Sequence, residues 1–219
     1  MSSVEELFNN NEKMGSLCIL VALVGLVLTI LGIITAVVWE FSIFFVILVA
    51  IGTLVFVYLT YQFGVELRDN SVDKVPLPFV TNIIGPLIDH SHKLTRSSIF
   101  AGIVKYFGMG LIISSIFFII AYAVEGLGFL IGAFVIRILI GLVFLWASKE
   151  ISAGGNHSFM WILLVVLFAI LLIISLISII GSLVILDLIG IASALMLMVF
   201  SGYALYLGMT PEVKTQMGV

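Results

Sequence analysis

Charged side chains are scarce in this sequence. Asp, Glu, Lys and Arg make up 10% of its 219 residues, whereas soluble globular domains carry about 25%. Apolar residues make up 63% of the chain. A water-soluble fold of this size could not cover so much apolar surface. We therefore expect lipid to surround most of the chain.

Cysteine and histidine are scarce as well. The single cysteine, Cys18, excludes an intramolecular disulfide and a Cys-x-x-Cys redox pair, and we expect it to behave as a small buried hydrophobic residue. None of the three histidines lies in an apolar run, which excludes an intramembrane bis-histidine haem. The sequence also has no nucleotide-binding loop. We expect no catalytic residue, no cofactor, no metal and no nucleic-acid partner.

Six apolar runs are long enough to cross a bilayer, which takes about 20 residues of helix. They cover residues 15–39, 41–63, 102–124, 126–148, 159–180 and 183–208. The last two runs form one continuous apolar stretch. Gly181–Ser182 is the helix-weak pair near the middle of that stretch, so the sequence predicts the turn between the fifth and sixth helices there.

Positive charge is confined to one side of the six runs. Seven of the nine Lys and Arg residues lie on that side, and the three tight turns on the other side contain none. Positively charged loops stay in the cytoplasm, which predicts that both termini are inside. The seven residues are Lys13, Arg68, Lys74, Lys93, Arg96, Lys149 and Lys214.

These observations predict an all-α fold, a polytopic membrane helix bundle. Its six transmembrane helices form three hairpins with short outer turns. The predicted segments are a cytoplasmic N-terminal segment (1–14), hairpin 1 (15–63), a cytoplasmic loop (64–101), hairpin 2 (102–148), a second cytoplasmic loop (149–158), hairpin 3 (159–208) and a cytoplasmic tail (209–219).

The loop 64–101 is the one substantial segment outside the predicted spans. Apolar residues recur at helical spacing after Pro78, and Pro86 should kink the helix that they form. We predict a kinked amphipathic helix on the inner leaflet, with lipid-headgroup contacts from Lys93, Arg96 and Lys105. The alternative is a helix packed beneath the bundle with no lipid role.

Three charged residues lie within the apolar runs, where charge is costly and marks a functional hypothesis. Lys105, close to the inner end of the third run, is expected to reach the inner interface. Arg137 lies near the middle of the fourth run and Asp187 near the outer end of the sixth. They are a candidate intramembrane polar pair, with Glu40 and Glu125 as a candidate outer acidic rim. The pair could serve helix packing alone, or line an ion or substrate site. Alternatively, Arg137 could face a partner subunit.

Two functions agree with this pattern. The first is a non-catalytic membrane protein, either an accessory or structural subunit of a membrane complex or a membrane-organising bundle. The second is a small transporter or channel with Arg137 and Asp187 on its path. Partners are the lipid bilayer and other membrane subunits or a second copy of the chain. Small residues at spacing four, such as Gly32/Ala36, Gly128/Gly132 and Gly190/Ala194, allow close helix approach. We expect a multi-pass protein of a prokaryotic cell membrane.

Overall fold

The computed structural model describes residues 3–39, 42–69, 95–126 and 131–219, and the regular structure within these ranges is helical. Six of the described helices are long and apolar enough to cross a membrane, as predicted. They are α2 (Asn11–Val38), α3 (Ile43–Arg68), α5 (Arg96–Val124), α6 (Ile131–Ala153), α7 (Ser158–Val184) and α8 (Leu188–Gly208). Two short helices, α1 (Ser3–Asn9) and α9 (Pro211–Gln216), accompany them. The chain is a multi-pass membrane protein.

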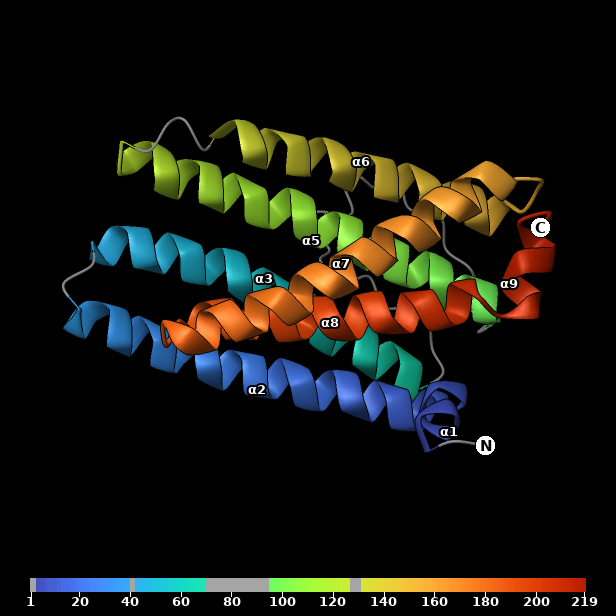
Figure 1. Cartoon of the computed structure of the whole chain (residues 1–219), viewed down its shortest axis with the longest axis horizontal. Coiled ribbons are helices and arrows are strands. Elements are labelled where there is room, and N and C mark those ends of the chain that lie inside the picture. Colours follow the sequence, from blue (N-terminus) through green and yellow to red (C-terminus); the bar gives the residue numbers. More distant parts are fainter. Residues whose placement is uncertain (1–2, 40–41, 70–94, 127–130) are drawn as a thin grey trace.

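The spanning helices form three antiparallel hairpins, α2–α3, α5–α6 and α7–α8 (Figure 1). Packing of α3 on α5 and of α2 on α8 joins the hairpins into one bundle. Helices α6 and α7 lie at its periphery. Of an 18-residue apolar stretch of α7, 17% is buried inside the protein, whereas 44% of the corresponding stretch of α5 is buried. A helix that is apolar all round is stable in this position because lipid covers the rest of its surface.

The bundle has two unlike ends. We call the end that carries α1 and α9 the charged end, and the opposite end, where each hairpin reverses, the turn end (Figure 1). The described loop and terminal cations all lie at the charged end: Lys13, Arg68, Arg96, Lys149 and Lys214. This one-sided distribution is the basis for predicting that the charged end is cytoplasmic. The side itself stays a prediction.

Short polar side chains begin four of the spanning helices. Each accepts a hydrogen bond from the backbone N–H three residues further on, which satisfies one of the free donors at a helix start. These capping residues are Asn10, Ser42, Thr95 and Asp187. The cap at Thr95 begins α5 several residues before the predicted span, and α3 continues to Arg68. Both ends of the predicted 64–101 loop are therefore helical, while the residues predicted to form its amphipathic helix lie outside the described ones.

The predicted turn at Gly181–Ser182 is wrong. Helix α7 continues through this pair to Val184, and the chain reverses at Ile185–Asp187. Leu186 makes the reversal with a φ of 56°, and the Asp187 N–H donates to the Ser182 carbonyl at 2.8 Å. Gly181 does not end α7 because backbone groups in lipid must keep their hydrogen bonds within the helix, and glycine is tolerated there.

Aromatic rings fill the charged-end half of the bundle. Phe107 of α5 lies at its centre, with its ring centroid 5.2 Å from that of Phe144 and 5.8 Å from that of Phe168. Cys18 borders this core and is buried, as predicted. Dense packing of large rings leaves little room for water. The buried rings of this core are Phe63, Phe100, Tyr106, Phe107, Phe144, Phe168, Phe200 and Tyr203.

Candidate functional site

A pocket with a volume of about 580 Å³ opens at the turn end. Its walls come from the last turns of α2, the first turns of α3, the end of α5, the α7–α8 turn and the start of α8. Most of the lining is apolar or aromatic. The polar side chains on it are Thr35, Thr53, Tyr122, Asp187 and Ser193.

Among the described residues that line this pocket, Asp187 is the one carboxylate. It is the N-cap of α8, and its Oδ1 accepts the Gly190 N–H at 2.9 Å. A Cβ at Gly190 would overlap with Asp187 Oδ2 and lie 2.5 Å from Ser182 Oγ. Gly190 therefore leaves room for the capping carboxylate. The cap places a negative charge where the chain re-enters the bundle.

Two hydroxyl groups join α3 to α8 on the wall of the pocket. Thr53 Oγ1 lies 3.2 Å from Ser193 Oγ, within hydrogen-bond distance. Sequence reasoning missed this contact, since hydroxyl residues are common in membrane helices and their spacing does not reveal a partner on another helix. Interhelical hydroxyl contacts of this kind hold membrane helices together.

Arg137 lies on α6 with its guanidinium on two aromatic rings. Its Cζ is 5.2 Å from the ring centroid of Phe118 and 5.7 Å from that of Phe134. The side chain is half-buried. Among the described residues no carboxylate lies within salt-bridge distance of it. The stacking replaces part of the hydration that the cation loses.

The structure does not bring Arg137 and Asp187 into an ion pair. Helix α6 packs mainly on α5, so Arg137 turns toward Phe118 of α5. Asp187 instead lies where α8 packs on α2 and α3. Phe118 lines the pocket together with Asp187, whereas Arg137 does not line it.

The acidic rim is described only in part. Glu125 follows the last turn of α5, and its N–H donates to the Ala121 carbonyl at 3.2 Å. Its side chain is exposed at the turn end but does not line the pocket. Glu40 lies outside the described residues, so its place in the rim stays a prediction.

Lys93, Arg96 and Lys105 were expected to contact lipid headgroups, and the structure describes the surroundings of the last two. Lys105 is only 7% exposed in the bundle, and its Nζ lies 5.3 Å from the Tyr106 ring centroid, so its contact with lipid headgroups stays a prediction. Arg96 donates to Asn9 Oδ1 at 2.7 Å and lies 3.4 Å from a Glu212 carboxylate oxygen. Its guanidinium is thus held by α1 and α9. Lys93 lies outside the described residues.

A buried carboxylate near the charged end was missed. Glu66 of α3 is 5% exposed, and the Tyr106 hydroxyl donates to its Oε1 at 2.5 Å. Sequence reasoning placed Glu66 in the loop because the apolar run ends before it. Helical spacing could have revealed it. If the helix is continued past residue 63, Glu66 and Leu67 fall on the same face as Phe63, and this face points into the bundle.

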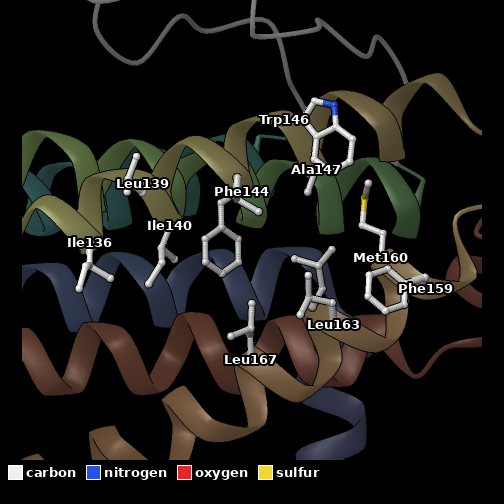
Figure 2. Close-up of a pocket in the computed structure, with 12 residues that line it drawn as sticks. Ile136, Leu139, Ile140, Phe144, Trp146, Ala147, Phe159, Met160, Leu163 and Leu167 are labelled. Atoms are coloured by element: carbon white, nitrogen blue, oxygen red, sulfur yellow. The ribbon is translucent and has the colours of Figure 1, made fainter.

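A second cavity, of about 280 Å³, lies between α6 and α7. Figure 2 shows Ile136, Ile140 and Phe144 pointing from α6 toward Leu163 and Leu167 of α7. Every lining residue is apolar or aromatic. The groove therefore suits lipid tails and offers no polar group to orient another ligand.

The pairs of small residues have different surroundings. Gly32 of α2 lies against Ile189 of α8, where an added Cβ would clash. No atom lies near a Cβ built at Gly132 of α6, and Gly128 lies outside the described residues. The close approach predicted from sequence is thus present at Gly32 within the chain, while Gly132 faces open space.

Comparison with known proteins adds no relationship to these observations. No protein-family model, no curated protein and no solved structure matches the chain. The bundle itself has two chemically distinctive features, Arg137 and the pocket at the turn end.

Proposed function

We propose that this chain is a non-catalytic membrane protein that serves as an accessory subunit of a larger membrane assembly. The observation that carries the proposal is Arg137. It lies six residues after the start of α6, about 9 Å along the helix. A guanidinium has five N–H donors, and the described residues provide it with aromatic faces but no hydrogen-bond acceptor.

The surroundings of Arg137 support a partner helix. The neighbouring residues Val135, Ile136 and Leu139 are exposed and apolar, so a second membrane helix could pack over them. An arginine in the middle of a membrane helix costs about 2.5–3.5 kcal/mol on insertion scales. A carboxylate or carbonyl acceptor from a neighbouring subunit would offset that cost. Packing of small and apolar residues would then add to the contact.

The aromatic core argues for this function over transport. Rings of α3, α5, α6 and α7 fill the charged-end half of the bundle, among them Phe63, Phe107 and Phe144. The interior hydroxyls also bond mainly to their own helices; Thr29 and Ser201, for example, donate to carbonyls four residues earlier. A static bundle of this kind suits a scaffold better than a polar path.

The test compares Arg137→Leu with Ile173→Ala, which changes an exposed apolar position on α7, outside the proposed partner surface, and keeps the charge. Each is extracted from its native membrane in a mild detergent, and the size of the intact complex is measured by native mass spectrometry. We expect wild type and Ile173→Ala in one larger assembly and Arg137→Leu as a lone, folded chain. The proposal would be contradicted if the wild-type protein had the mass of a single chain, or if a folded Arg137→Leu chain were still found in the larger assembly.

The second candidate is a small transporter, and the pocket at the turn end favours it. The pocket combines a carboxylate with hydroxyls, as substrate sites of transporters do. Transport would require the aromatic core to open. The chain in proteoliposomes should then dissipate an imposed proton or cation gradient faster than protein-free vesicles do. Asp187→Asn should abolish that excess, whereas a rate equal to that of empty vesicles speaks for the subunit.

A further inference from the structure

Three of the four hydroxyls on the wall of the turn-end pocket donate to backbone carbonyls, and Tyr122 carries the fourth. Thr35 Oγ1 donates to the Gly32 carbonyl at 3.0 Å, and Ser193 Oγ donates to the Ile189 carbonyl at 3.1 Å. Thr53 Oγ1 lies 3.2 Å from the Val49 carbonyl and the same distance from Ser193 Oγ. A hydroxyl has one proton and two lone pairs, so these groups are left as acceptors. These three hydroxyls therefore suit a ligand that donates hydrogen bonds.

The charge of the pocket has one sign. Asp187 contributes a carboxylate, and the described lining includes no Lys, Arg or His side chain. Gly190 N–H occupies Oδ1, which leaves Oδ2 as a further acceptor. Arg137 does not line the pocket, and its guanidinium stacks on Phe118. A cation with N–H donors is the complement of this surface.

The remaining lining is apolar and partly aromatic. Val46 and Val49 of α3 provide aliphatic surface, and Trp39 and Phe45 provide ring faces, which also attract cations. Ligand sites commonly combine such an apolar wall with a few polar groups that fix orientation. The ligand that matches therefore has a long apolar part beside its cationic head.

The α7–α8 turn offers the apolar part of that ligand an apolar surface. Val184, Ile185 and Leu186 are apolar and strongly exposed, with Val184 79% exposed. Leu186 keeps an apolar side chain at a φ of 56°, where glycine is usual. Ile185 and Leu186 also line the pocket, so the apolar wall of the pocket continues into the exposed surface of the turn. The tail of a bound amphiphile could lie along this surface.

We propose that the pocket at the turn end binds the primary ammonium head of a long-chain membrane amphiphile, with Asp187 as the counter-ion and Thr35, Thr53 and Ser193 as hydrogen-bond acceptors. The tail extends past the α7–α8 turn into the lipid. This inference rests on neither proposed function, because binding at equilibrium requires neither a partner subunit nor transport.

The test uses probes that share one tail and differ in their heads. The purified full chain, in a nonionic maltoside detergent at pH 7, is titrated with dodecylammonium, dodecanol or dodecanoate, and bound probe is counted by native mass spectrometry. A hydrogen bond to a charged group is worth about 1.5–3 kcal/mol, so dodecylammonium should bind about tenfold or more tighter than dodecanol. Dodecanoate should bind weakest. Equal binding of dodecanoate and dodecylammonium would overturn the proposal.

Two variants locate the binding. Asp187→Asn removes the charge and keeps an N-cap, because asparagine also accepts the Gly190 N–H. It should weaken dodecylammonium binding about tenfold, whereas Glu125→Gln, which removes another turn-end carboxylate, should leave it unchanged. An unchanged Asp187→Asn affinity, or an equal loss in both variants, would overturn the assignment. Ser193→Ala, with an expected smaller loss, provides the same test if Asp187→Asn fails to fold.

Short-chain ethylammonium separates an amphiphile from a free amine. It has the same head without the tail, so its affinity should fall by at least tenfold relative to dodecylammonium, since each buried methylene contributes about 0.8 kcal/mol. Equal affinities would overturn the lipid origin of the ligand. The outcome is independent of the size of the native assembly and of any flux in proteoliposomes.

Discussion

Gly108 of α5 and Gly141 of α6 contact each other through their backbones. A Cβ built on either glycine would lie 2.8 Å from the carbonyl oxygen of the other. Gly15 and Gly64 have the same reciprocal relationship between α2 and α3 near the charged end. Two of the three hairpins are therefore held at a separation that only glycine permits, as is common between membrane helices.

Gly108→Ala should loosen the α5–α6 hairpin. The added methyl group meets backbone rather than a movable side chain, so we expect a loss of about 1–3 kcal/mol in unfolding free energy. Gly132→Ala on α6 is the control, because nothing lies within 4 Å of its Cβ. The thermal unfolding midpoint in detergent measures both. A midpoint for Gly108→Ala as high as that for Gly132→Ala would show that the hairpin can shift without cost.

Leu186→Gly should stabilise the α7–α8 turn. A left-handed backbone costs a residue with a Cβ about 1–2 kcal/mol, and glycine avoids that cost while losing some backbone entropy. The expected net gain is about 0.5–1 kcal/mol. Leu183→Gly, inside α7, should instead lower stability by about 1 kcal/mol. Chemical denaturation in detergent distinguishes the two signs, and a loss in both variants would contradict the strain at Leu186.

Tyr106→Phe should destabilise the charged-end half of the bundle. The change removes the hydroxyl that donates to Glu66 while keeping the ring, and a buried hydrogen bond to a carboxylate is worth about 1.5–3 kcal/mol. Tyr61→Phe, at an exposed position on α3, is the matched control. Differential scanning fluorimetry of both variants is sufficient. Equal midpoints would mean that the Tyr106–Glu66 contact contributes nothing to stability.

The pH dependence of α1 should follow Glu6. The Lys13 ammonium, at 2.5 Å from Glu6 Oε1, lowers the pKa of that carboxyl through a hydrogen bond and through charge. A lowered carboxyl pKa contributes stability above the unfolded pKa, and this contribution disappears as the pH falls through the lowered value. Carbon-13 NMR titration should show the Glu6 pKa rising toward its ordinary value in Lys13→Met. Lys149→Met, which removes a distant charge, should leave it unchanged.

The orientation can be tested with single cysteines. Cys18 is 1% exposed, so the wild-type chain should not react with a membrane-impermeant maleimide and provides the blank. Glu125→Cys at the turn end should react from outside intact cells. Lys149→Cys at the charged end should react only after the cells are opened. The reverse pattern would place the charged end outside and overturn the prediction that both termini are cytoplasmic.

The number of spans and their hairpin order could be predicted from sequence because lipid imposes simple rules. A helix in hydrocarbon must be apolar over about 20 residues, so composition alone marks residues such as 102–124 as a span. The boundaries were less certain. Gly181 was predicted to break a helix, but its backbone remains hydrogen-bonded within α7, and the turn lies at Leu186 instead.

Side-chain contacts between helices could not be predicted in the same way. Sequence by itself determined that Arg137 is a charge in a costly place, because cost depends only on the type of residue and its depth. Asp187, which was predicted to lie within the sixth span, is exposed immediately before α8 instead. Tertiary structure decided that Arg137 stacks on Phe118 and that Asp187 caps α8 beside Thr53 and Ser193. The reason is that apolar helices carry no amphipathic stripe to set their rotation. Packing of backbone and rings, as at Gly108 and Gly141, sets that rotation and so decides which polar groups meet.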